Sequence, residues 1–423
     1  MNKYKNFQIS NTVIDLALQA EQMSLKQFEN VHEIENINQL KVLNAFHINK
    51  IGEVHFSSTN GYGYNDVGRD AIDRLFATIF DTEDALVRHN IISGTHAISV
   101  ALNGILRPND LLLSVTGKPY DTLEEVIGLR GEGKGSLKDF GIKYKQIDYS
   151  LNKSNSDDFL SIIKEEIPRL VFFQKSRGYA AGKRSISAAE IGRMIELIKR
   201  ISPNIICFVD NCYGEFVEDI EPTNVGADLI AGSLIKNAGG GIVQSGGYIA
   251  GRKQLVELAA YKLNSVGIGK EAGASLGHNR EILQGIFMAP HIVAQAKKSA
   301  IFCANLFKLS GFTASPDGDD YRADIVQSIQ LKSEEELSAF CEGIQKGSPI
   351  DSFVAPKGWS MPGYSCDVIM AAGGFVQGSS IELSADAPIK PPFTVYIQGG
   401  LTYYSAKLGV MMALDNVLSC KNR

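Results

Sequence analysis

Short apolar runs alternate with amphipathic segments through the middle of this chain, and this alternation restricts its fold more than any other feature. The apolar runs span residues 85–87, 111–115, 170–173, 205–209, 229–231 and 242–250. The segments between them, such as 187–200, have the residue spacing of amphipathic helices. Strands that alternate with helices form a parallel or mixed sheet covered on both faces. The pattern therefore predicts an α/β fold with a mixed, mostly parallel sheet.

The regions that flank this pattern are organised differently. Residues 12–44 have helical periodicity with a charged, Gln/Asn-rich middle, which predicts exposed helices that form an arm. After about residue 251, a long helical stretch over 280–309 precedes a section with the strand-like sequences "DIVQSIQL" and "FTVYIQ". We therefore expect an N-terminal helical arm (1–60), a large α/β domain (61–280), and a linking helix with a small C-terminal α+β domain (281–423).

Composition excludes several classes of protein. The net charge is -5 over 423 residues, whereas nonspecific nucleic-acid binding needs a clustered basic face. No cysteine spacing resembles a zinc site, so we expect no metal, and the scattered cysteines are typical of reduced thiols in a cytoplasmic protein. We expect no membrane association, because no apolar run approaches the length of about 20 residues that a membrane span requires.

A glycine-rich stretch at 128–135, "GLRGEGKG", nearly matches a nucleotide-binding phosphate loop. The residue after Lys134 is Gly135, so the magnesium-binding hydroxyl of that motif is displaced to Ser136. The motif must also follow a strand, and the preceding "TLEEVIG" is typical of a helix. We therefore interpret this stretch as a surface loop.

The sequence "ISGTHAIS" is the first of four pieces that fit one ligand. Ser93, Gly94 and Thr95 follow an apolar run and precede a helical segment, so backbone N–H groups of the helix N-terminus can bind a phosphate there. An ordinary Ser/Thr helix cap has the same sequence. Tyr120 stands after the next run, at the same predicted sheet edge, where it either stacks on a planar ring or belongs to a turn.

The other two pieces are an aspartate and a lysine. Asp210 ends the run 205–209, which places a carboxylate at the edge where ligands bind in open α/β sheets. Such an acid can pair with a protonated ring nitrogen, or it can cap a turn. Lys236 follows the next run in "SLIKNAGGG", three residues after Ser233. A desolvated lysine has a lowered pKa and attacks aldehydes, although a solvated turn also explains a glycine cluster.

In chain order, these four pieces resemble the site of the aspartate-aminotransferase-like enzymes that use pyridoxal 5'-phosphate (PLP). Within that class, the chain is similar to the methionine gamma-lyase-like or cystathionine beta-lyase-like family associated with aluminium resistance. The motifs that carry this resemblance are "GYGYNDVGRD", "SGTHAI", "GKPYDTLEEVIG", "VFFQKSRGY", "VDNCYGEF", "GSLIKNAGGGIVQSGGYIAGR" and "VYIQGGLTY". The resemblance implies an aspartate-aminotransferase-like large domain, PLP as cofactor, and a carbon–sulfur lyase acting on a methionine- or cystathionine-type amino acid. Aldol cleavage, transamination, or PLP binding without turnover are the alternatives.

The resemblance also implies roles for individual residues. Lys236 would hold the cofactor covalently and move the substrate α-proton, Asp210 would bind the pyridinium nitrogen, and Tyr120 would stack on the ring. The expected phosphate-binding residues are Ser93, Gly94, Thr95 and Ser233. Gln174 or Ser176 would lie near the ring hydroxyl.

Further residues are implied in substrate binding and in assembly. Arg177 and Tyr179 are candidates for the phosphate or the substrate, unless they belong to a solvated loop. Lys390 stands where the resemblance places an arginine for the substrate carboxylate; otherwise it is a surface lysine, and Arg177 or Arg280 binds that group.

The Gly/Tyr-rich segment "NGYGYNDVGRD" occupies the place where related lyases reach into a neighbouring subunit. The resemblance puts Tyr62 on their phosphate-binding tyrosine and Tyr64 where many relatives have arginine, a charge that Arg69 would then supply. It implies a homodimer or homotetramer with shared active sites.

Overall fold

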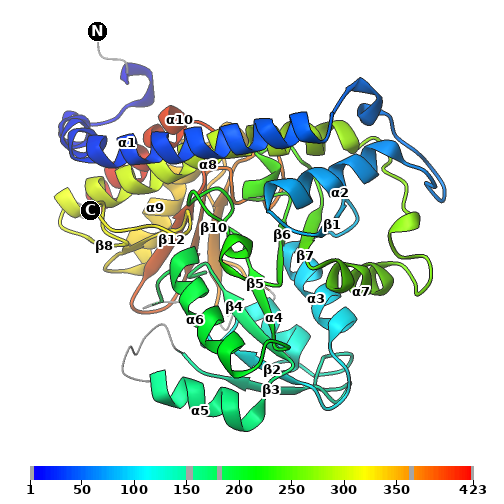
Figure 1. The fold of residues 1–423 in the computed structure, drawn as a ribbon. Helices are drawn as coiled ribbons and strands as arrows, with labels where there is room; N and C mark the ends of the chain where they lie inside the picture. Colours follow the sequence, from blue (N-terminus) through cyan, green and yellow to red (C-terminus); the bar gives the residue numbers. More distant parts are fainter. Residues whose placement is uncertain (1–3, 149–155, 179–182, 362–365, 421–423) are drawn as a thin grey trace. The chain divides into compact units, whose positions relative to one another are not determined.

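The computed structural model describes residues 4–148, 156–178, 183–361 and 366–420 (Figure 1). The chain divides into two compact units. Unit 1 comprises Met1–Asn36 and Pro290–Arg423, and unit 2 comprises Ile37–Ala289. The unit boundaries differ from the expected ones at residues 60 and 280. Both divisions fall inside continuous helices, α1 (Asn11–Ile48) and α8 (Asn279–Leu309), so no linker composition marks them.

Unit 2 is built on a sheet that contains seven strands among the described residues, in the order β1-β7-β6-β5-β4-β2-β3. Its strands are β1 (Asp84–Arg88), β2 (Leu111–Ser114), β3 (Lys143–Gln146), β4 (Leu170–Gln174), β5 (Ile206–Asp210), β6 (Leu229–Ser233) and β7 (Gly247–Gly251). Strand β7 runs antiparallel to both β1 and β6, and the other pairs are parallel. The expected mixed, mostly parallel sheet is confirmed.

Apart from the polar edge strand β3, the strands of this sheet are mostly apolar because helices cover both of its faces. In β4, Leu170 and Phe172 join one core cluster with residues of α3 and α7, and the intervening Val171 and Phe173 are equally buried on the opposite face. The helices of this unit are α2 (Val67–Ile79), α3 (Gly94–Ile105), α4 (Asp121–Ile127), α5 (Ser156–Glu166), α6 (Ala188–Ile201) and α7 (Lys253–Leu263). Figure 1 shows α3 and α7 side by side.

The apolar run 242–250 becomes a strand only in its second half. Strand β7 begins at Gly247, whereas Ile242 and Val243 lie in the preceding turn. Gly240 and Gly241 have φ angles of 56° and 69°, a left-handed conformation that ends extended structure and favours glycine. The turn after Lys236 therefore continues further than the hydrophobic pattern predicts.

Unit 1 contains the small α+β section that the sequence predicts. Its antiparallel sheet has the order β10-β11-β12-β9-β8 among the described residues. The strands are β8 (Thr313–Ser315), β9 (Gln327–Gln330), β10 (Val368–Ala372), β11 (Ser384–Pro388) and β12 (Thr394–Gln398), and the helices are α9 (Glu334–Lys346) and α10 (Tyr403–Cys420).

The N-terminal arm is one packed helix rather than several exposed ones. Val13, Ala17 and Ala20, on the first turns of α1, are fully buried in the core cluster of unit 1 with Phe302 and Phe307. Among the described residues, we find no helix with the length and apolar content that crossing a membrane requires.

Candidate active site

The predicted polar residues lie at the ends of three neighbouring parallel strands. Gln174 is the last residue of β4, Asp210 the last of β5 and Ser233 the last of β6. Gln174 is the register partner of Asp210, and Asp210 is the partner of Ala231, so the three side chains stand at one edge. This is the carboxyl edge, where open α/β sheets bind their ligands.

The N-terminus of α3 meets the same edge. Because β7 is antiparallel to both of its neighbours, β1 runs in the direction of β6, and α3 begins shortly after β1. Ser93 caps the helix, since its hydroxyl accepts a hydrogen bond from His96 N at 3.0 Å. A Cβ on Gly94 would lie 2.7 Å from Cys212 Sγ and 3.7 Å from Ser233 Cβ. The helix N-terminus therefore lies directly against the turns that follow β5 and β6.

Tyr120 links the α3 turn to β4. Its hydroxyl lies 3.0 Å from Thr95 Oγ1, and its backbone N donates to Gln174 Oε1 at 3.2 Å. Burial raises the pKa of the Tyr120 phenol well above its usual value, and the charge of Asp210 raises this pKa further. The phenol is therefore neutral and lies within electrostatic reach of the Asp210 carboxyl group.

Asp210 is 5% exposed and accepts a hydrogen bond from Cys212 N at 3.1 Å. Burial raises the pKa of the Asp210 carboxyl group, whereas the Lys236 ammonium and the Cys212 N–H oppose this rise. The buried carboxyl group of Asp210 is thus within electrostatic reach of the Lys236 ammonium.

Lys236 directly precedes a short 3₁₀ turn, Asn237–Gly239, and its Nζ lies 4.0 Å from the ring centroid of Tyr213. Burial lowers the pKa of Lys236, but Cys212, Tyr213, Asp210 and Tyr120 raise it more, so that the pKa lies above its ordinary value. The expectation of a lowered lysine pKa is therefore wrong, because the neighbouring acidic groups outweigh desolvation.

The loop after β4 carries three further predicted residues. Ser176 and Arg177 are buried, with 6% and 3% of their surface exposed, rather than solvated. The Ser176 carbonyl accepts a hydrogen bond from Gln174 Nε2 at 3.2 Å, and its hydroxyl accepts one from Gly178 N at 3.2 Å. Tyr179 lies outside the described residues.

Tyr62 and Tyr64 lie on a firmly held loop of unit 2. Their rings stack with centroids 5.6 Å apart, and they are 76% and 57% exposed. Arg69 Nη1 donates to Gly63 O at 2.7 Å and to Gly273 O at 3.0 Å, and its Nε donates to Asp70. Arg69 is only 4% exposed, so in this structure its charge holds the loop rather than facing solvent.

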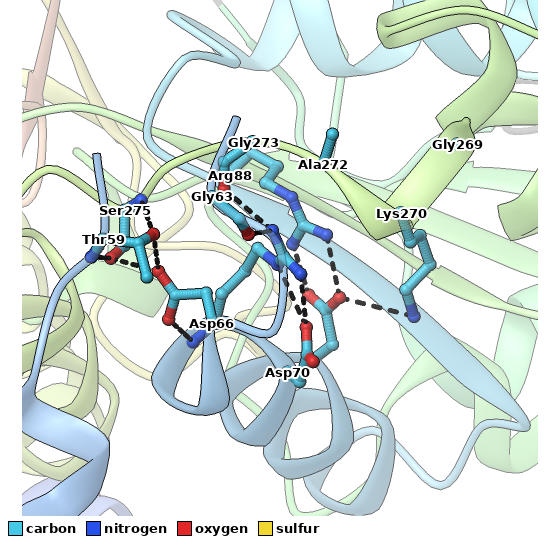
Figure 2. A network of polar contacts seen from close by, with 12 residues as sticks. Thr59, Gly63, Asp66, Asp70, Arg88, Gly269, Lys270, Ala272, Gly273 and Ser275 are labelled. Atoms are coloured by element: carbon cyan, nitrogen blue, oxygen red, sulfur yellow. Dashed lines mark hydrogen bonds and ion pairs between the residues drawn. The ribbon is translucent and has the colours of Figure 1, made fainter. Parts of the chain in front are cut away.

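A second group of contacts holds the start of this loop (Figure 2). Asp66 Oδ2 accepts hydrogen bonds from Thr59 Oγ1 and Ser275 Oγ, both at 2.5 Å, and Figure 2 shows these three side chains pointing toward one another. The backbone N of Gly273 donates to Tyr62 O at 2.9 Å. The two exposed tyrosines are therefore presented by a fixed backbone.

The two remaining cationic candidates lie in different units. Lys390 belongs to unit 1, where it is exposed on the turn between β11 and β12. Arg280 belongs to unit 2, and its guanidinium lies 5.5 Å from the ring centroid of Phe56.

The phosphate-loop-like stretch at 128–135 is a loop that follows helix α4, not a strand. Lys134 is exposed and pairs with Glu132 at 2.9 Å. Both observations confirm the interpretation as a surface loop.

Comparison with known proteins identifies the family. The family model described as methionine gamma-lyase matches residues 13–418. The chain belongs to the methionine gamma-lyase family. The uncharacterized protein YnbB of Bacillus subtilis (strain 168) is 49% identical over 391 residues, which cover 92% of each chain. A carbon–sulfur lyase involved in aluminum resistance from Clostridium novyi NT is 48% identical, with a TM-score of 0.93 over 97% of both chains.

A distant structural relative has the same fold. The pyridoxal-5'-phosphate dependent protein YhfS from Escherichia coli is 13% identical, with a TM-score of 0.63 over 92% of this chain and 97% of that chain. The aspartate-aminotransferase-like fold expected from the motifs is thereby confirmed, and so is the resemblance to this family.

Two residues of this site have no place in the sequence-based prediction. Cys212 and Tyr213 stand two and three residues after Asp210; Cys212 lies against Gly94, and the ring of Tyr213 faces Lys236. Their signal is weak, since a cysteine and a tyrosine after a strand are usually core or turn residues. The close spacing to Asp210 in "VDNCYGEF" is the feature that could have revealed them.

Proposed function

We propose that this member of the methionine gamma-lyase family is a PLP-dependent carbon–sulfur lyase that eliminates a thiol from a methionine- or cystathionine-type amino acid. The observation that carries the proposal is the group formed by Asp210, Lys236, Tyr120 and Thr95 at the carboxyl edge of the sheet. The Clostridium novyi relative, a carbon–sulfur lyase, supports the choice of reaction. The six cysteines are free thiols, which supports a cytoplasmic location.

The residues present fit PLP. The first N–H groups of α3 have no acceptor within the helix, and together with the Ser93, Thr95 and Ser233 hydroxyls they form a suitable phosphate site. Gly94 leaves room because a side chain there would strike Cys212. Asp210 is a buried acceptor for a protonated ring nitrogen.

Asp210, Tyr120 and Lys236 would each have a defined task in this reaction. Bound PLP supplies an electron-withdrawing ring that acidifies the substrate α-carbon. Asp210 holds the proton on the ring nitrogen, and Tyr120 supports the ring face. Lys236 Nζ would hold the cofactor covalently and, with substrate bound, would accept the α-proton and return a proton later. The thiolate then leaves from the β-carbon or, after a second deprotonation, from the γ-carbon. Hydrolysis yields ammonia and a 2-oxo acid.

The pKa of Lys236 supports this sequence of events. The acidic neighbours raise the pKa of the amine and favour its protonated form. A protonated ring nitrogen on Asp210 would neutralise that carboxylate and weaken its hold on the ammonium. Neutralising Asp210 would therefore favour the proton-accepting form of Lys236.

A product screen tests the reaction. The PLP-loaded protein is incubated with L-methionine, L-cystathionine and L-threonine, and thiol, ammonia and 2-oxo acid are identified by mass. We expect thiol release from at least one of the sulfur substrates and none with the Lys236→Ala variant. Lys134→Ala, a change at an exposed residue, is the matched control. Glycine and acetaldehyde from threonine, without thiol release from either sulfur amino acid, would indicate an aldolase instead.

The protein would act as a homodimer or homotetramer in which the Tyr62 and Tyr64 loop contributes to a neighbouring site. The support is that two adjacent tyrosines are exposed on a loop that the Arg69 and Asp66 contacts hold in place. Mixing inactive Lys236→Ala subunits with impaired Tyr62→Phe subunits should restore activity, since one composite site would then be intact. If mixed oligomers form and activity does not return, the shared-site model is wrong.

A further inference from the structure

Glu215 is a fully buried acid that lies against the strand leading to Lys236. None of its surface is exposed, and its Oε1 accepts a hydrogen bond from Tyr248 Oη, on β7, at 2.8 Å. A Cβ on Gly232 would lie 2.4 Å from the same oxygen. Only glycine at this position of β6 allows the carboxyl group to lie so close to the backbone. The carboxyl group therefore packs directly before Ser233, the last residue of that strand.

The backbone of Glu215 also holds the turn that carries Lys236. Asn237, the next residue after the lysine, is fully buried and donates from Nδ2 to Glu215 O at 3.0 Å. Glu215 itself belongs to the turn that follows Asp210. One residue thus connects the turn after β5, the turn after β6, and β7.

Glu215, Asn237, Tyr248 and Asn211 form a buried polar network. Hydrogen-bond acceptors outnumber donors in this network. Among the described residues, the buried side-chain oxygens without a hydrogen-bond partner include three in this network: Glu215 Oε2, Asn211 Oδ1 and Asn237 Oδ1. Asn211 belongs to the same network, because its Nδ2 lies 2.9 Å from Glu221 Oε2 and 3.5 Å from Tyr248 Oη. A proton on Oε2 would turn one of these unmatched acceptors into a donor.

In the part of the chain that the structure describes, no cation forms an ion pair with Glu215, although the charge of Lys236 acts on it from further away. The buried ammonium of Lys175 pairs with Glu218 at 2.8 Å rather than with Glu215. A buried carboxylate with one unmatched oxygen and no paired cation is strongly disfavoured, and such a group is usually neutral. The geometry therefore favours the carboxylic acid form.

We propose that Glu215 is carried in the folded protein as a neutral carboxylic acid and acts as a positioning residue for Lys236. Burial raises the pKa of Glu215 to about 8, and Glu221 raises it too, whereas hydrogen bonds from its own backbone and from Tyr248, and the charge of Lys236, lower it. Only the effect on Lys236 rests on the proposed function. The protonation of Glu215 is a property of the fold alone.

The charge state of Glu215 matters because Lys236 lies within its electrostatic reach. As a neutral acid, it leaves Asp210 as the anion that a cofactor's ring nitrogen meets. Above a pH of about 8 it becomes a second anion near Lys236, which stabilises the protonated lysine nitrogen and raises its pKa. Neutral Glu215 thus holds the lysine turn without adding negative charge.

Infrared difference spectra of the full-length protein test the protonation. The spectrum of a Glu215→Gln variant is subtracted from that of wild type at about pH 6 and about pH 10. We expect a carboxylic-acid carbonyl band of wild type at the lower pH that disappears at the higher pH. Glu132→Gln, at an exposed site, should show no such band at either pH. A carboxylate band for Glu215 already at the lower pH would overturn the proposal.

A second variant keeps the test decisive if Glu215→Gln fails to fold. Tyr248→Phe removes the donor to Oε1, a bond that favours the ionised acid, so the Glu215 band should titrate at higher pH than in wild type. An unchanged or lowered titration would contradict the assignment of the band to Glu215.

The effect on Lys236 has a spectroscopic readout of its own. With PLP bound, the visible absorption band of the cofactor reports the protonation of the nitrogen of Lys236. This band should titrate at lower pH in Glu215→Gln than in wild type, since the variant cannot gain the second anion. Identical titrations would remove Glu215 from any role toward Lys236. Failure to bind PLP would refute the proposed function and leave the infrared result unaffected.

Discussion

The Nζ atom of Lys236 lies 4.0 Å from the ring centroid of Tyr213, within the range of a cation–π contact. Tyr213 stands three residues after Asp210 with a φ of 69°, a left-handed conformation that a non-glycine residue adopts at a cost of about 1–2 kcal/mol. Such strain persists where the surrounding structure enforces it, which often happens at functional sites. The ring therefore acts as a platform beneath the lysine.

Removing that ring should lower the pKa of Lys236. A cation–π contact of about 0.5–2 kcal/mol corresponds to about 0.4–1.5 pH units, so Tyr213→Ala should shift the amine by that amount, whereas Tyr213→Phe keeps the ring face. The pH dependence of Lys236 labelling by an amine reagent measures the shift. Equal pKa values in the alanine and phenylalanine variants would show that the ring face does not hold the ammonium.

Gly94 should tolerate a side chain only when Cys212 is shortened. In Gly94→Ala, the new Cβ would lie 2.7 Å from Cys212 Sγ, and overpacking of this kind costs about 1–3 kcal/mol. Cys212→Ala removes the sulfur, so the double variant should recover most of the free energy of unfolding in urea. Gly52→Ala, with no atom within 4 Å of the added Cβ, is the matched control. Purely additive losses in the double variant would contradict this contact.

The ionised Asp66 carboxylate should stabilise the protein, and this stabilisation should be lost in acid. Burial raises the pKa of its carboxyl group, but four hydrogen bonds outweigh burial and lower the pKa to about 2 from 3.8; the donors are Arg69 N, Ser275, Thr59 and Asn279. Because the folded pKa is the lower one, the stabilisation is present above pH 3.8 and is lost as the pH falls through about 2. Its size is about 2 kcal/mol at neutral pH.

Comparing wild type with Asp66→Asn isolates this contribution. The difference in unfolding free energy should be largest near neutral pH and should shrink as the pH falls from about 5 to about 2. Asp351→Asn, at an exposed position, should show no such trend. A difference that stays constant with pH would mean that Asp66 is not an ionised cap of α2.

Lys390 is the proposed contact for the substrate carboxylate. Lysine offers a point charge where arginine offers a two-pronged contact, so Lys390→Arg should keep or lower the Michaelis constant. Lys390→Ala should raise it about 10- to 100-fold, the range for losing a charged hydrogen bond. Steady-state kinetics on the accepted substrate measures both. Unchanged kinetics in both variants would transfer the role to Arg177 or Arg280.

Strand β11 shows where reading the sequence fails. Ser384–Pro388 is buried throughout, although it carries serine, aspartate and proline. Asp386 can be buried because Gln398 Nε2 donates to its Oδ2 at 3.0 Å. That partner comes from another strand, so no local hydrophobic pattern reveals it. The apolar strands β4 and β5, in contrast, are visible because their burial requires nothing from a distant partner.

The sequence by itself determined the α/β class and the order in which Gly94, Tyr120, Asp210 and Lys236 reach one sheet edge. Apolar runs must be buried, and parallel strands joined by helices bring their carboxyl ends together. Only the tertiary structure decided that Tyr213 lies under Lys236 and that Glu215 is enclosed beside Gly232. Such contacts depend on the register and close approach of strands distant in the chain, which local periodicity does not encode.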